Sequence, residues 1–452
     1  MALSDVGALP VGAAARKAWP RRGSLRMHAA PRAVRAVGAT LFDGQDRPVL
    51  DAAAAFAGAV AGHCRREVAD AVHAQLCVLD GVAQAPRDAL AAVFAERLGE
   101  GLPEAFARWV FAESVNDALG AALSVAFAWQ RMRGEMQRTV VISNDRAAAG
   151  ASAPVAPPAA GPMAVAHLAP PWLARNRFYK GQPEQGADEA DELERLIAAL
   201  GAHTVAACVM RPLAVAQGVY VPPAGYLERV RMICDAHDVL LCFDETLCSA
   251  GRFGDASTAS SLGVTPDLLV LGDEWTNGAQ PFAAVAVSDA VWAGLGDGVH
   301  LPPGLRGPRA LHPLHTLQVP DTAHLSPASP GCAPARAAGC AAALATLELF
   351  EREQLIDRAA SSSQHFLDVV FSLSDLPVVT DIRGYGLAAG IDLRTIEAAG
   401  PRTAEIQRRL WDAGLNVASC GDTLMLAPPL CIGAEDIDSI GAMLRAVLSD
   451  AA

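Results

Sequence analysis

The sequence predicts an α/β fold, in which a mainly parallel sheet carries helices on both faces and a smaller α+β unit follows. The first observation is a series of short, nearly continuous apolar runs at 139–143, 205–210, 239–244, 268–272 and 282–288. Such runs are typical of strands buried on both faces of a parallel sheet. The second observation is that helical patterns lie between several of these runs, which indicates crossover connections.

Two helical patterns are clear. Residues 114–133 place Leu119, Ala122 and Ala126 at steps of three and four, and residues 225–237 follow a Pro-Pro pair and precede an apolar run.

The third observation is that proline-rich stretches at 153–171 and 302–334 interrupt the alternation, so long surface loops are expected there. The expected order after the second stretch is a helix at about 335–374, a strand around 378–393, a helix near 402–413, two short strands at 415–430 and a final helix from about 434.

Composition excludes several classes of function. A net charge of -13 and a pI near 5.3 argue against a general nucleic-acid binder, which needs a cationic face. No apolar run approaches the length of a membrane span. The cysteines and histidines show no metal-ligand spacing, so no metal site is expected.

The first 42 residues hold six arginines and a single acid, Asp5. Such a start fits either an ordinary N-terminal arm or a mitochondrial transit peptide. The arm is the favoured interpretation, and the expected location is cytoplasmic. The chain contains only two lysines, Lys17 and Lys180.

Several blocks together resemble the class III, fold-type I aminotransferases that use pyridoxal 5′-phosphate (PLP), in particular their ω-amino-acid–pyruvate branch. They include AGHCRREVADAV at 61–72, RNRFYKGQPEQGADEADELERL at 175–196, GVYVPPAGYLERVRMICDAHDVLLCFDE at 218–245 and TNGAQP at 276–281. The resemblance runs in family order from about residue 40 to the C-terminus.

The resemblance implies a domain organisation. An N-terminal segment at 1–59 would pack with the small domain, residues 60–325 would form the large domain with a seven-stranded type of sheet, and residues 326–452 would form the small α+β domain. It also implies a dimer with each active site at the subunit interface, either a homodimer or a heterodimer with an active relative. No nucleic acid or membrane partner is expected.

The family's chemistry depends on one lysine, which forms a Schiff base with PLP and shuttles the proton. The resemblance places that position at Asp273, three residues before Thr276. An arginine cannot replace the amine, because its guanidinium stays protonated. PLP is therefore expected not to bind covalently, and it is open whether it binds at all.

The other family positions are degenerate as well. Ser114, Val115 and Asn116 align with the phosphate loop, where Val115 replaces a glycine that lets the backbone approach the phosphate. Ala148 stands where an aromatic ring stacks on the cofactor, and Cys332 aligns near a threonine that reaches the partner's phosphate. The remaining two positions concern the substrate: Ala57 replaces a tryptophan and Ala418 the arginine that grips the carboxylate.

Two charged residues complete the expected site. Asp244 matches the aspartate that pairs with the pyridinium nitrogen, although an Asp that ends a buried strand can also cap backbone N–H groups. Arg211 replaces a family glutamate on a neighbouring strand. It is expected either to pair with Asp273 or Asp244, filling the vacated pocket, or to point outward to solvent.

Three functions remain open from the sequence. The main interpretation is a pseudo-aminotransferase that acts as a binding, scaffolding or regulatory subunit. The first alternative is an enzyme with lysine-independent chemistry in the same cleft, using carboxylates such as Asp273, Asp244 and Glu113. The second alternative is the PLP-dependent transamination that the family name implies.

Overall fold

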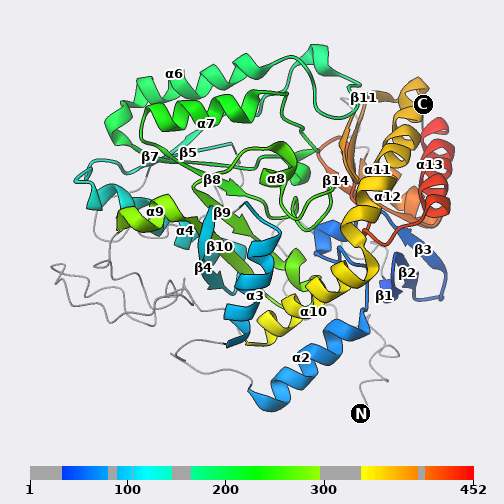
Figure 1. The fold of residues 1–452 in the computed structure, drawn as a ribbon. Coiled ribbons are helices and arrows are strands. Elements are labelled where there is room, and N and C mark those ends of the chain that lie inside the picture. Colours follow the sequence, from blue (N-terminus) through cyan, green and yellow to red (C-terminus); the bar gives the residue numbers. More distant parts are fainter. Residues whose placement is uncertain are drawn as a thin grey trace, which may run out of the picture.

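The structure is a computed structural model that describes residues 33–79, 89–103, 105–144, 164–295, 337–394 and 403–451. Figure 1 shows a central sheet with helices on both sides and, at the opposite end from α9, a group of smaller sheets and the C-terminal helices. Within the described ranges, no helix combines the length and the apolar character needed to cross a bilayer.

The central sheet has seven strands in the order β4-β10-β9-β8-β7-β5-β6. In chain order they are β4 (Phe106–Ala112), β5 (Val140–Ser143), β6 (Ala164–His167), β7 (Val205–Met210), β8 (Leu240–Asp244), β9 (Leu268–Leu271) and β10 (Ala283–Ser288). Strand β10 pairs antiparallel with both β4 and β9, and the remaining pairs are parallel. The predicted fold class is confirmed, because six strands share one direction.

Both faces of this sheet are buried, which explains the continuous apolar runs. In β8, Leu241 and Phe243 belong to one hydrophobic cluster, and Leu240 and Cys242 belong to another on the opposite face. Successive strand side chains point to opposite faces, so a strand covered on both sides must be apolar at every position.

Helices cover the two faces. One face is covered by α4 (Val115–Met132) with α9 (Asp289–Leu295) beside it, and the other by α6 (Asp191–Leu200), α7 (Tyr226–Ala236), α3 (Ala89–Glu100) and α10 (Ala337–Glu353). Helix α4 begins where the sequence predicts, because Ser114 caps its first turn.

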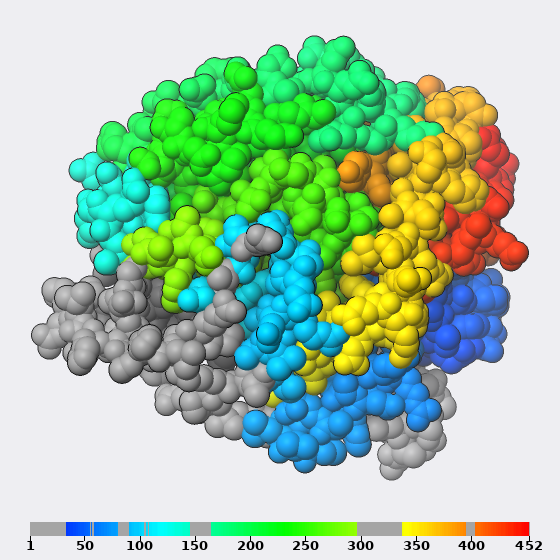
Figure 2. All heavy atoms as spheres, in the orientation of Figure 1, coloured from blue at the N-terminus to red at the C-terminus, as the bar shows by residue number. Residues whose placement is uncertain are grey.

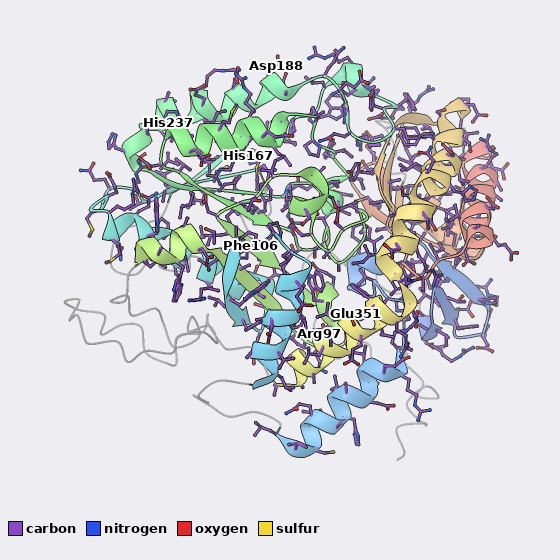
Figure 3. The ribbon with its side chains drawn as sticks, viewed as in Figure 1. Arg97, Phe106, His167, Asp188, His237 and Glu351 are labelled. Atoms are coloured by element: carbon purple, nitrogen blue, oxygen red, sulfur yellow. The ribbon has the colours of Figure 1, made fainter. Side chains whose placement is uncertain are left out.

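Helix α10 packs between α3 and α2 (Arg66–Val78), and Figure 2 shows its yellow surface between the cyan and blue of these two helices. Arg97 of α3 donates from Nη2 to Glu351 of α10 over 2.7 Å, and Figure 3 shows the two labelled side chains close together. This contact joins residues that are far apart in the sequence.

Two four-stranded sheets complete the fold. One has the order β1-β2-β3-β13 and the other β11-β12-β15-β14. The strands are β1 (Ala33–Val37), β2 (Thr40–Asp43), β3 (Pro48–Asp51), β11 (Val379–Tyr385), β12 (Ala388–Leu393), β13 (Leu415–Asn416), β14 (Ala418–Cys420) and β15 (Thr423–Leu426). Because β3 pairs with β13, the N-terminal segment joins the C-terminal part of the chain.

Several expected elements differ in detail. Strand β6 lies inside the stretch 153–171 that the sequence predicts as a surface loop, because residues 164–167 pair with β5. The single helix predicted at 335–374 is two helices, α10 and α11 (Leu355–Phe371), because Gln354 takes a left-handed conformation with φ 50°. The strand expected at 378–393 is a hairpin that turns at Gly386, and the two strands expected at 415–430 are three. The two C-terminal helices, α12 (Thr403–Asp412) and α13 (Ala434–Ser449), lie where predicted.

Asn277 fixes the segment before α2 onto the central sheet. Its Oδ1 accepts from the backbone N–H of Ala61 and its Nδ2 donates to the carbonyl of Gly62, both over 2.8 Å. Asn277 has φ 54°, a left-handed conformation that asparagine tolerates better than most residues.

Replacing Asn277 by alanine should therefore lower the free energy of unfolding by about 1–3 kcal/mol, because two buried backbone groups lose their partners. Urea unfolding of the purified protein measures this change. Asn116→Ala, at an exposed position in α4, is the matched control and should change stability little. Equal effects of the two variants would contradict the role assigned to Asn277.

Candidate functional site

The candidate site lies at the carboxyl edge of the central sheet. Because β4, β9, β8 and β7 run in the same direction, the residues that follow them meet at one edge. These residues are Ser114 after β4, Asp273 after β9, Asp244 at the end of β8 and Arg211 after β7. Ligands of open α/β sheets bind outside this edge.

Asp244 has a partner for each carboxylate oxygen. Its Oδ1 accepts from the backbone N–H of Thr246 over 3.1 Å and from the hydroxyl of Thr246 over 2.6 Å. Its Oδ2 lies 3.3 Å from Nη2 of Arg211. The side chain of Asp244 is only 3% exposed, so the pair with Arg211 is largely shielded from water.

The backbone of Arg211 is held by Asn144, which follows β5. The N–H of Arg211 donates to Oδ1 of Asn144 over 2.9 Å, and Nδ2 of Asn144 donates to the carbonyl of Arg211 over 3.1 Å. The register of β7 and β8 pairs Met210 with Phe243, so the next residues, Arg211 and Asp244, come side by side. The guanidinium is directed at Asp244 and not outward.

Asp273 lies on the other side of Asp244. It opens a short 3-10 helix, η8 (Asp273–Thr276), and its carbonyl accepts from the hydroxyl of Thr276 over 2.8 Å. Its carboxyl carbon lies beside Gly58. Burial raises the pKa of Asp273, and among the described residues no cation forms an ion pair with it.

Two further acids behind this edge are fully buried. Glu274 accepts from the hydroxyl of Ser249 over 2.6 Å, and burial raises its pKa to about 7. Glu245 accepts from the hydroxyl of Ser257 over 2.9 Å, and burial raises its pKa to about 8. The sequence interpretation did not single out Glu274; the signal was an Asp-Glu pair directly after a buried strand.

The N-terminus of α4 is capped by the chain itself. The hydroxyl of Ser114 accepts from the N–H of Asp117 over 3.2 Å and donates to Oδ2 of Asp117 over 2.7 Å. Val115 and Asn116 form the first turn, and Asn116 is exposed. Asp117 was not among the predicted site residues, although Ser-x-x-Asp before an apolar helix resembles a capping box.

The other predicted positions contribute less. Ala418 begins β14 and pairs with Met425 of β15, and Ala57 ends a 3-10 helix, η3 (Ala54–Ala57). Ala148 and Cys332 lie outside the described residues. Within the described ranges, no group of three or more potential ligands is arranged to hold a metal ion.

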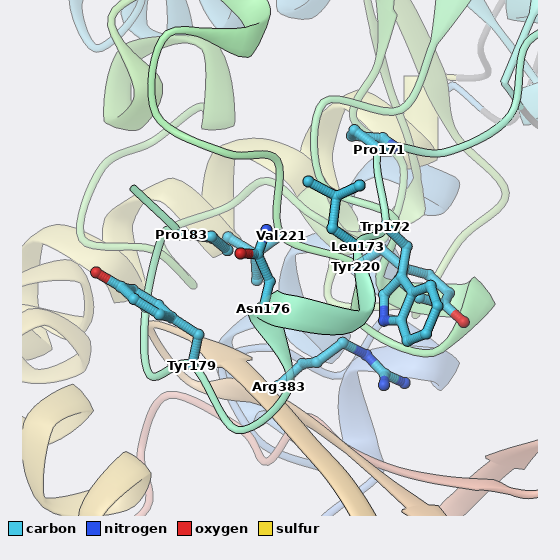
Figure 4. Close-up of a pocket in the computed structure, with 10 residues that line it drawn as sticks. Pro171, Trp172, Leu173, Asn176, Tyr179, Pro183, Tyr220, Val221 and Arg383 are labelled. Atoms are coloured by element: carbon cyan, nitrogen blue, oxygen red, sulfur yellow. The ribbon is translucent and has the colours of Figure 1, made fainter. Parts of the chain in front are cut away.

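Two shallow hollows lie near this edge. One, of about 320 Å³ including its opening to solvent, is lined by Trp172, Tyr220 and Arg383, and Figure 4 shows the Arg383 side chain directed toward the two rings. The other, of about 250 Å³, is lined by Asn144 and Arg211 among others. Neither is lined by Asp244 or Asp273.

The seven-stranded sheet and the smaller sheets beside it define a fold-type I transferase scaffold, and comparison with known proteins identifies the family. Residues 24–301 and 335–448 match the family described as "Aminotransferase class-III". The chain belongs to the class III aminotransferases, as the sequence motifs indicated.

Named relatives span nearly the whole chain. It is similar to the "Omega-aminotransferase" of Caulobacter vibrioides, with 34% identity over 89% of this chain and 90% of that protein. It is also similar to the "Omega-amino acid--pyruvate aminotransferase" of Pseudomonas putida, with 32% identity over 92% of each.

Solved structures support the fold. The omega transaminase from Pseudomonas jessenii, solved in complex with PMP, aligns with a TM-score of 0.79 and 24% identity over 96% of each chain. An (S)-enantioselective omega-transaminase from Thermomicrobium roseum aligns with the same TM-score and identity, over 96% of this chain and 95% of that one.

The residues at the strand ends do not fit the cofactor that the family uses. Asp273 offers a carboxylate where the resemblance expects an amine, and Asp244 already has a guanidinium on Oδ2. At the expected phosphate end, the side chain of Ser114 and the carboxylate of Asp117 occupy the helix N-terminus. The residues at this edge therefore lack the amine that would hold PLP covalently, and the carboxylate of Asp244 is not free for a ring nitrogen.

The raised pKa of Glu274 makes stability depend on pH. Its pKa is 4.5 in an unfolded chain and about 7 here, so the folded state holds the proton more tightly. This contribution is fully present below pH 4.5 and is lost as pH rises through about 7, at up to about 1.4 kcal/mol per pH unit.

Glu274→Gln should therefore weaken the fall in melting temperature between pH 5 and pH 8, because glutamine has no proton to lose. Glu245 still titrates in this variant, so part of the slope remains. Thermal unfolding across this pH range measures the effect, with the exposed Glu405→Gln as control. An unchanged slope in Glu274→Gln would count against this assignment.

Proposed function

We propose that this class III aminotransferase homologue is a pseudo-aminotransferase, which lacks Schiff-base chemistry and acts as a binding, scaffolding or regulatory subunit. The observation that carries the proposal is Asp273, which follows the carboxyl end of β9 at the same edge of the sheet where Asp244 ends β8. A carboxylate cannot form an imine with an aldehyde, so the step that the family depends on has no amine at this position.

Neither lysine offers a substitute. Lys180 forms an ion pair with Asp368 of α11 and lies 5.7 Å from the ring centre of Phe371, and its backbone bridges to Gly384 of β11. Lys17 lies outside the described residues. The proposal therefore depends on the chemistry of position 273 and on the contacts that hold Lys180 at β11.

The proposed partner is a second copy of the chain or an active relative, and the proposed location is cytoplasmic. Both proposals follow from the family resemblance and from the interpretation of residues 1–42 as an arm. Size measurement of the purified protein alone, and after co-expression with an active class III relative, distinguishes the two kinds of partner.

The second candidate function is transamination of an ω-amino acid or amine, which the names of the relatives favour. Those names belong to proteins with 34% and 32% identity to this chain. This function requires an amine in the cleft to carry the cofactor. A lysine-independent reaction that uses Asp273 and Asp244 is the remaining alternative, and it requires a substrate that reaches Asp273.

Titration with PLP distinguishes these functions. The purified protein should show no Schiff-base absorbance band, and mass spectrometry after borohydride reduction should find no PLP fixed near residue 273. A class III transaminase treated in parallel is the positive control. A band that borohydride fixes within the cleft, together with turnover of an amine and pyruvate, would establish the second candidate instead.

Asp273→Lys alone should restore no transamination. The new amine would meet a cleft in which Val115 and Ala148 replace the phosphate-loop glycine and the stacking ring, and in which Arg211 pairs with Asp244. Amine–pyruvate turnover measures the outcome, with Asp273→Asn as a control that changes the charge without adding an amine. Turnover by the lysine variant above that of the asparagine variant would show a more intact pocket than proposed.

A further inference from the structure

We infer that side chains of this chain occupy the two places where the ancestral cofactor made charged contacts, Asp244 at the ring end and the N-terminus of α4 at the phosphate end. Neither place then needs a phosphorylated pyridine as its charge partner. This inference rests on the proposed function and extends it, because it concerns non-covalent binding as well as the Schiff base. Its two supports are the Arg211–Asp244 pair and the Ser114–Asp117 cap.

The first support is the ion pair at the end of β8. Asp244 is 3% exposed and Arg211 is 15% exposed, with 3.3 Å between Nη2 and Oδ2. Thr246 takes the other oxygen of Asp244. A cationic ring nitrogen could approach this carboxylate only by displacing the guanidinium, and a buried charge that loses its partner is costly.

The second support is the first turn of α4. A long helix attracts an anion at its N-terminus through free backbone N–H groups and the helix dipole. Here Ser114 accepts from the N–H of Asp117, and the carboxylate of Asp117 already supplies a negative charge in this turn. A phosphate would therefore face a like charge at this helix end, and this repulsion weakens its binding.

The two supports are independent, because they lie on β7–β8 and on β4–α4, which β10 and β9 separate in the sheet. Each one replaces a charge of the ligand by a charge of the chain, a cation at the ring end and an anion at the phosphate end. The fold then needs no cofactor to neutralise Asp244 or to cap α4.

Pyridoxamine 5′-phosphate is the probe that separates this inference from the proposed function. It carries the ring and the phosphate but cannot form a Schiff base with any lysine, so its binding does not depend on residue 273. Calorimetric titration of the purified protein should give a Kd weaker than 100 μM. A Kd of 100 μM or tighter would overturn the inference, even if PLP still forms no Schiff base.

A double variant tests the two contacts directly. Arg211→Met combined with Asp117→Asn frees Asp244 and removes the carboxylate from the first turn of α4, so affinity for pyridoxamine 5′-phosphate should increase at least tenfold. The matched control is Arg408→Met with Asp412→Asn, an exposed pair on α12. A gain below tenfold, or an equal gain in the control, would contradict the inference.

If Arg211→Met does not fold, the titration of Asp117→Asn alone still decides the phosphate end. Asp117→Asn keeps the capping hydroxyl of Ser114, and it should increase the affinity for inorganic phosphate at least threefold over the unmodified protein. No increase would remove the carboxylate of Asp117 as the cause of exclusion. Circular dichroism of each variant verifies that α4 and the rest of the fold persist.

Discussion

The parallel register of β7, β8 and β9 is the constraint on which the candidate site depends. It brings the residues after three separate strands to one edge, with Asp244 in the middle, Arg211 on one side and Asp273 on the other. Because both faces of these strands are buried, the register cannot slip without exposing core residues. The positions of the charges therefore follow from the packing of the apolar strands.

The charges at this edge compensate one another to different degrees. Asp244 is paired with Arg211, whereas Glu245 and Glu274 accept hydrogen bonds and have pKa values that burial raises to about 8 and about 7, which favours their neutral forms. Asp273 is partly exposed and has no described cation beside it. The sequence resemblance implies a lysine and an aspartate at this edge, whereas here position 273 is an aspartate and the second aspartate, Asp244, pairs with Arg211.

The sequence predicted the central sheet well, because continuous apolar runs leave few alternatives for β7, β8 and β9. It missed both edge strands, β4 and β6, and β6 lies inside the proline-rich stretch 153–171 that was expected to be a loop. Strand β4 carries Arg108, whose guanidinium lies 5.4 Å from the ring of Trp292; an edge strand can include such a residue. The break between α10 and α11 also had no local signal, since Gln354 is neither glycine nor proline. For the site, the strand-end positions were predicted, whereas Glu274 and Asp117 were not.

The sequence by itself determined the family and the identity of the residue at 273, because motif order and residue chemistry do not depend on coordinates. It left open whether Arg211 pairs with Asp273, pairs with Asp244 or points to solvent. Only the tertiary structure decided this. The register of β7 and β8 and the two hydrogen bonds between Asn144 and the backbone of Arg211 place the guanidinium next to Asp244. Pairing between distant residues is a property of packing, and no local pattern records it.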